Sequence, residues 1–101
     1  MRFSEAEIVK RLTEAAAAAG CKLTYSHKMF FLRLLDFAEQ DSQGYYVQRT
    51  VSDIAKVCRL AERTVSDSLK QLAAAGAVRT ETRGKPSLRR IDDSFIEGRD
   101  E

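Results

Sequence analysis

Hydrophobic residues recur along this chain mostly with the spacing of amphipathic helices. Between residues 5 and 19 one apolar stripe has the helical period: Ile8, Leu12, Ala15, Ala16 and Ala19. Ser4 and Glu7 have the spacing of a capping box before it, and Gly20 follows as a natural stop. The pattern predicts a helix over residues 5–19, whose alanine run at residues 15–19 packs inside the monomer or against a second copy.

A second helix is predicted to begin near residues 24–26 and to run to about residue 39. Its apolar positions surround the helix almost completely: Met29, Phe30, Phe31, Leu32, Leu34, Leu35, Phe37 and Ala38. A helix that is apolar all round is normally central to a core. Residues 41–44 form a predicted turn, and residues 45–47 a short predicted strand.

The stretch from residue 50 to residue 72 predicts two short helices that meet across a tight turn. Thr50 is the expected N-cap of the first, which runs to about Cys58. The second runs from residue 61 or 62 to Ala75, and Gly76 ends it. Packing of the two helices requires one buried set: Val51, Ile54, Ala55, Cys58, Leu60, Val65, Leu69 and Leu72.

Beyond Gly76 the pattern changes to that of a β-hairpin. Residues 77–83 and 87–91 are the predicted strands, and Gly84-Lys85-Pro86 is the turn between them. Residues 92–101 are mostly acidic and are expected to form a flexible tail. We therefore expect one domain over residues 1–91, made of an N-terminal helix within residues 1–20 and a core over residues 25–91.

Charge is distributed unevenly, although the net charge is only +2. Residues 1–45 hold six basic and six acidic side chains and are neutral overall. Residues 46–91 hold ten basic and four acidic side chains, a net charge of +6, whereas residues 92–101 carry −4. The positive charge thus falls on the two-helix unit and the hairpin, where a surface that binds phosphate groups would need it.

Other classes of protein find little support in the sequence. No apolar run approaches the length of a membrane span. Cys21 and Cys58 are far apart, which favours reduced thiols in a cytoplasmic protein over a disulfide or a metal site. The single histidine, His27, is expected to be a surface or capping residue. No catalytic, metal-binding or cofactor motif is present, so an enzyme is not expected.

The order of elements and three local motifs resemble the winged helix-turn-helix family over roughly residues 25–91. The motifs are Thr-x-x-x-Ile-Ala at residues 50–55, Arg-Thr-Val-Ser at residues 63–66, and Leu-x-x-x-Gly-x-Val at residues 72–78. The likeness is to small modules of phage and plasmid replication proteins and of compact bacterial repressors. It implies a mainly α fold with a small β-hairpin wing.

The resemblance also implies sequence-specific binding of double-stranded DNA, as a transcription regulator or a replication-initiation module. The second helix of the pair would enter the major groove, with Arg63 able to contact a guanine edge. The candidate contacts of this helix are Glu62, Arg63, Thr64, Ser66, Asp67 and Lys70. The candidate contacts of the wing and the backbone are Arg49, Lys56, Arg79, Arg83, Lys85, Arg89 and Arg90.

Alternatives remain open at three points. Glu62 and Asp67 could accept from a cytosine amino group, or form ion pairs within the helix, for example Asp67 with Arg63 or Lys70. A module of this size contacts few base pairs, which favours a homodimer through the N-terminal helix. The alternative function is a winged-helix adaptor that binds a protein partner rather than DNA.

Two positions depart from the pattern of the family. Many members have glycine where this chain has Arg59, because the backbone there often adopts a positive φ. Many also have serine or threonine at the N-cap where this chain has Ala61. Arginine incurs a steric penalty at a positive φ, so these differences predict a turn that differs in detail, or a weakly capped second helix.

Overall fold

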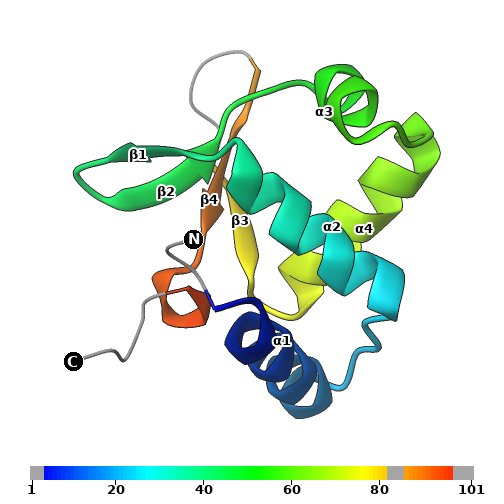
Figure 1. Cartoon of the computed structure of the whole chain (residues 1–101), viewed down its shortest axis with the longest axis vertical. Coiled ribbons are helices and arrows are strands. Elements are labelled where there is room, and N and C mark those ends of the chain that lie inside the picture. Colours follow the sequence, from blue (N-terminus) through cyan, green and yellow to red (C-terminus); the bar gives the residue numbers. More distant parts are fainter. Residues whose placement is uncertain (1–3, 82–85, 97–101) are drawn as a thin grey trace.

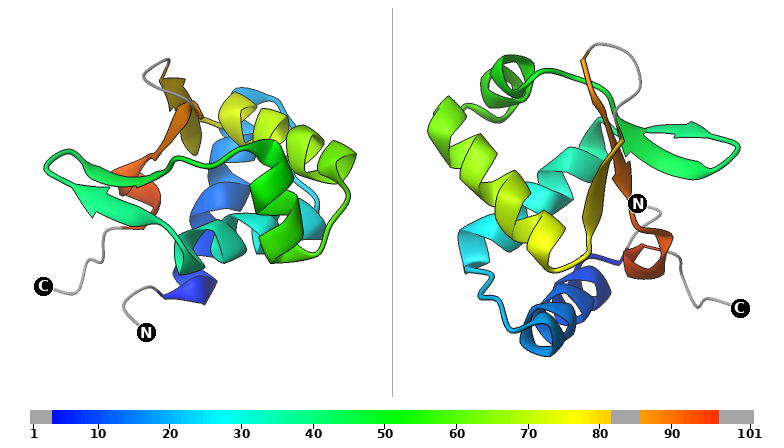
Figure 2. Two further views of the ribbon diagram at one scale, coloured as in Figure 1. Left: turned by 90° about the horizontal axis from the view of Figure 1, so that it is seen from above. Right: turned by 180° about the vertical axis from the view of Figure 1, so that it is seen from behind.

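The computed structural model describes residues 4–81 and 86–96. Within these residues the protein is mainly helical, with four α-helices and a small antiparallel sheet of four strands (Figure 1). Helix α2 packs against α4, which also contacts β3, and the pair α3 and α4 lies on the opposite side of the molecule from the β1–β2 hairpin (Figure 2). None of the described helices is long and apolar enough to cross a membrane.

Helix α1, Glu5–Ala19, has the predicted bounds. The Ser4 hydroxyl accepts a hydrogen bond from the Glu7 amide at 3.3 Å, and Gly20 ends the helix with a φ of 74°. Ile8, Leu12 and Ala16 are buried against the rest of the same chain. Of the run Ala15–Ala19, Ala16 packs inside the monomer and Ala15 is half-buried, whereas Ala17, Ala18 and Ala19 are exposed.

Helix α2, Tyr25–Asp36, forms the middle of the core through its all-round apolar surface. Its Thr24 hydroxyl accepts from the His27 amide, and His27 Nδ1 accepts from the Thr24 amide in return. The predicted capping role of His27 is thus confirmed. The predicted end near residue 39 is wrong, because Glu39–Asp41 leaves the helix to form strand β1.

Helices α3, Val51–Cys58, and α4, Glu62–Ala74, form the predicted two-helix unit, but of its predicted buried set Leu60 is exposed and Val51 is only half-buried. The Thr50 hydroxyl caps α3 by accepting from the Asp53 amide at 3.0 Å. Arg59 takes the left-handed conformation, with φ 59° and ψ 48°, and Ala61 provides no side-chain cap for α4. Of the two predicted consequences, the weakly capped start of α4 is the one observed, and Arg59 adopts the positive φ in place of glycine, at a steric cost.

The sheet has the strand order β1-β2-β4-β3. Its strands are β1, Glu39–Asp41, β2, Gly44–Val47, β3, Val78–Glu81, and β4, Leu88–Ile91. Strand β2 pairs with β4 so that Val47 lies opposite Arg89, which attaches the strand before α3 to the hairpin after α4. Strand β1 was not predicted. The β3–β4 hairpin was, although its residues 82–85 lie outside the described part of the chain.

The predicted flexible tail is wrong for residues 92–96. Asp93–Phe95 forms a short 3-10 helix, η1, and Phe95 and Ile96 are both buried in the core. The Phe95 ring packs edge-on against Phe31 with a centroid separation of 6.3 Å, and Arg11 of α1 donates to the Ser94 carbonyl at 3.0 Å. The packed domain therefore continues past residue 91 to residue 96, and residues 97–101 lie outside the described part.

Candidate nucleic-acid interface

Helix α4 buries one side and exposes the other. Its buried side, which includes Val65, Leu69 and Leu72, packs against α2, α3 and β3. All six side chains predicted to contact DNA lie on the exposed side: Glu62, Arg63, Thr64, Ser66, Asp67 and Lys70. Their common orientation follows from the helical period, because each is offset from the apolar stripe. The six residues form one polar surface, here called the α4 face.

The α4 face has no net charge, because Arg63 and Lys70 are balanced by Glu62 and Asp67. Positive charge near it comes from α3 and from the turn that joins the helices. Lys56 and Arg59 are both exposed there, against the exposed carboxylate of Asp53. Arg59 is not among the predicted DNA contacts, yet its exposed side chain adds a cation to the turn that precedes α4.

Asp67 has a partner that sequence spacing did not indicate. Its Oδ2 lies 3.2 Å from Nε2 of His27, the residue that caps α2. The two alternatives considered for Asp67 within the helix, Arg63 and Lys70, are not its partners among the described residues. A separation of 40 residues hides this pair from any reading of helical spacing.

The described basic residues of the hairpin differ in how far their side chains are exposed. Arg79 on β3 is exposed over 61% of its side chain and lies 3.9 Å from Glu81, at the limit of an ion pair. Arg83 and Lys85 lie outside the described residues. Arg89 on β4 is half-buried, and its Nη1 donates to the Arg49 carbonyl at 3.1 Å. Burial lowers the pKa of Arg89, and its bond to the backbone turns the guanidinium into the molecule.

Arg90 does not belong to an exposed basic surface, which corrects the prediction that it contacts the DNA backbone. Only 3% of the residue is exposed. Its guanidinium donates to both carboxylate oxygens of Asp41, at 2.8 and 3.2 Å, and to Gln43 Oε1 at 3.2 Å. Its Nε lies 3.6 Å from Glu81, and the hydrogen bond to Asp41 is the main reason that the pKa of Arg90 is raised. Arg90 therefore joins β4 to the β1–β2 hairpin.

The segment between β2 and α3 is bonded to the β3–β4 hairpin along β4 and toward its turn. Gln48 Nε2 donates to the Pro86 carbonyl at 3.1 Å, beside the bond from Arg89 to Arg49. The half-buried Arg49 guanidinium lies 5.2 Å from the centre of the Phe37 ring. These contacts hold the N-terminus of α3 and the hairpin together. Gln48 was not among the predicted site residues, because a single glutamine forms no sequence motif that would indicate its bond to Pro86.

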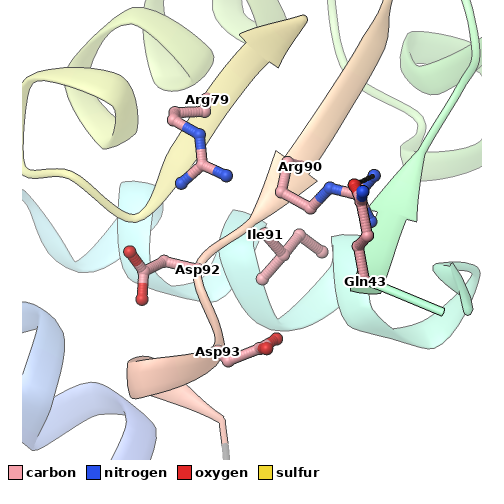
Figure 3. Close-up of a pocket in the computed structure, with 6 residues that line it drawn as sticks. All are labelled: Gln43, Arg79, Arg90, Ile91, Asp92 and Asp93. Carbon is pink, nitrogen blue, oxygen red and sulfur yellow. Dashed lines mark hydrogen bonds between the residues drawn. The ribbon is translucent and has the colours of Figure 1, made fainter. Parts of the chain in front are cut away.

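A polar hollow of about 230 Å³ lies elsewhere, between the β1–β2 turn, the β3–β4 strands and η1 (Figure 3). Arg90 extends there toward Gln43 and away from Arg79 (Figure 3). Asp92 and Asp93 complete the wall, and the Asp92 carboxylate also caps η1 by accepting from Ser94. The hollow mixes guanidinium and carboxylate groups and receives no residue from α3 or α4, so it is separate from the α4 face.

Comparison with known proteins adds no relative: the chain matches no model of a protein family, no curated protein and no solved structure.

Proposed function

We propose that this protein binds double-stranded DNA as a winged helix-turn-helix module, with the α4 face in the major groove and the β3–β4 hairpin on the adjacent backbone. The observation that carries the proposal is the α4 face itself. Its polar side chains point away from a helix whose other side is locked against α2 and α3. An exposed helix on such a support suits insertion into a groove.

The arrangement of the strands supports the same proposal. Strand β4 lies between β2 and β3, so the hairpin that follows α4 is held in one sheet with the strand that precedes α3. The bonds from Gln48 to Pro86 and from Arg89 to Arg49 reinforce this link. A helix and a hairpin held in this way can contact one duplex together. Base contacts from α4 would then determine the sequence, and cations of the hairpin would bind phosphates.

The salt dependence of binding to random-sequence duplex tests the proposal. Each phosphate that the protein neutralises contributes about −0.9 to the slope of log K against log salt. Lys56, Arg59, Arg63, Lys70 and Arg79 are exposed and available for such contacts. A slope steeper than about −3 is expected if most of them take part. A flat response, without retention on duplex DNA, would refute DNA binding.

The second candidate is an adaptor that binds a protein through the same surface. The absence of net charge on the α4 face favours it, because a carboxylate repels the phosphate backbone. The flat salt response described above is its expected signature.

The regulatory or replication role and the homodimer are finer parts of the proposal. Ile8, Leu12 and Ala16 of α1 are already buried in the monomer, so pairing through α1 would have to use its exposed side, which includes Ala17, Ala18 and Ala19. Selection of bound sequences from random duplexes tests the dimer, because a palindromic site with half-sites one helical turn apart is the expected result for a two-fold assembly.

A further inference from the structure

Asp67 is the only residue of the α4 face that another helix holds in place among the described residues. Its carboxylate lies within the face, one turn from both Arg63 and Lys70. Nevertheless its Oδ2 contacts Nε2 of His27 across the junction of α2 and α4, at 3.2 Å. The His27 side chain is only 13% exposed, whereas that of Asp67 is 59% exposed. The contact thus joins a covered imidazole to a carboxylate that faces solvent.

The hydrogen bonds determine which nitrogen of His27 carries the proton. Nδ1 accepts from the Thr24 backbone N–H at 3.2 Å, and a backbone amide can only donate. In the neutral imidazole the proton must then lie on Nε2, which faces Asp67. His27 therefore donates to Asp67 Oδ2, and the capping box of α2 fixes the ring that does so.

A carboxylate held in this way is oriented before any ligand arrives. One oxygen of Asp67 is occupied by His27, and no other described residue bonds to the carboxylate. The other oxygen, Oδ1, is left as an acceptor on the α4 face. In the major groove, the exocyclic amino group of cytosine is the donor that a carboxylate typically accepts from. A fixed acceptor loses less conformational entropy when it contacts a base than a free side chain does.

We infer that Asp67 determines specificity for a cytosine in the major groove and that His27 is the residue that positions it. This inference rests on the proposed DNA binding. It also assigns a use to an acid that would otherwise only weaken attraction to phosphates. Loss of the Asp67 carboxylate should therefore lower the preference for the selected site, while the affinity for random DNA stays equal or rises.

The experiment begins with selection of bound sequences by the unmodified protein and competition binding at each position of the selected site. Asp67→Ala should abolish a preference for cytosine at one position, about a tenfold loss of discrimination. Its affinity for random duplex should stay equal or rise, because a negative charge is removed.

Two substitutions of His27 separate positioning from support of the fold. Glutamate and glutamine both suit the third position of a capping box, so His27→Glu and His27→Gln should each keep the cap of α2. His27→Glu places a carboxylate against Asp67 and should reduce the cytosine preference as far as Asp67→Ala does. His27→Gln retains an N–H donor and should keep most of the cytosine preference of the unmodified protein. Thermal unfolding of each variant verifies that the fold is kept.

The possible results are distinct. An unchanged base preference in Asp67→Ala, with duplex binding intact, would overturn the inference and leave DNA binding standing. Equal loss in His27→Glu and His27→Gln, at unchanged stability, would overturn the positioning role. No binding to any duplex by the unmodified protein would refute the proposed function itself.

Discussion

The two ends of this molecule use charged residues in opposite ways. At the end formed by α3 and α4, apolar residues hold the helices together and the charged side chains face solvent. At the sheet end, Arg90, Asp41, Gln43 and Glu81 bond to one another, and Tyr46 donates to Glu39. In the first arrangement the charged groups are available to a ligand. In the second they pair with one another and stabilise the fold. A local excess of basic residues therefore does not by itself define a binding surface.

The largest effect is expected in the apolar contact between α3 and α4. Val65 is fully buried between the helices, so Val65→Asp would place an unpaired carboxylate in the core. We expect a loss of at least about 4 kcal/mol in the free energy of unfolding, measured by urea denaturation. The neighbouring exposed Ser66→Asp adds the same group at the surface and should change stability by less than about 0.5 kcal/mol. Similar losses from both would contradict the packing described.

The sheet end should fail next, through its buried cation. Arg90→Met keeps much of the volume of the side chain but leaves Asp41 without its bidentate partner. The expected loss is about 3 kcal/mol in the same unfolding measurement, because the change removes the buried guanidinium that compensates two partly buried carboxylates. Arg79→Met on the exposed strand is the matched control and should cost no more than about 0.5 kcal/mol. If Arg79→Met were the more damaging change, the structural role of Arg90 would be wrong.

A smaller effect, on binding rather than on folding, separates base contacts from phosphate contacts. Arg63→Ala should weaken a selected DNA site about tenfold and random duplex much less. Lys85→Ala should weaken both similarly and make the salt slope shallower by about 0.9. Lys85 lies outside the described residues, so this expectation rests on its charge and its place in the hairpin. Titration at several salt concentrations measures both quantities, and identical behaviour of the two variants would exclude α4 as the helix that recognises bases.

The smallest expected effect concerns the turn between α3 and α4. Arg59→Gly should raise the free energy of unfolding by about 0.5–1 kcal/mol, because glycine adopts a φ of 59° without the steric penalty of a side chain. Lys70→Gly makes a similar change in an exposed helical position and should lower stability by about 1 kcal/mol. Thermal unfolding of the two variants shows directly whether each substitution raises or lowers stability. Destabilisation by both would mean that Arg59 contributes contacts that outweigh its strain.

The sequence predicted the features that depend on neighbours along the chain. The helical period and the caps located α1, α3 and α4, and the glycine and proline signals located the hairpin after α4. Strand β1 was missed because Glu39, Gln40 and Asp41 are all exposed and show no alternation. The buried residues Phe95 and Ile96 were missed because acids surround them in the sequence.

The candidate site was predicted less completely, because its decisive contacts join distant residues. Arg90 has the same local character as Arg89, and only its pairing with Asp41, 49 residues away, shows that it is buried. His27 and Asp67 are likewise brought together only by the crossing of α2 and α4. Periodicity can show which side of α4 is exposed, but not which of its charges another helix already holds.

The contact of η1 with the start of the chain has a consequence for how the protein folds. Arg11 bonds to a carbonyl 83 residues later, and Phe95 completes a core that begins at Ile8. A contact over such a distance forms late, because the long loop must close before the contact contributes. During synthesis, part of the apolar surface of helices α1 and α2 therefore stays exposed until residues 93–96 have left the ribosome. A nascent chain stopped before that point should be more prone to aggregation than the finished one.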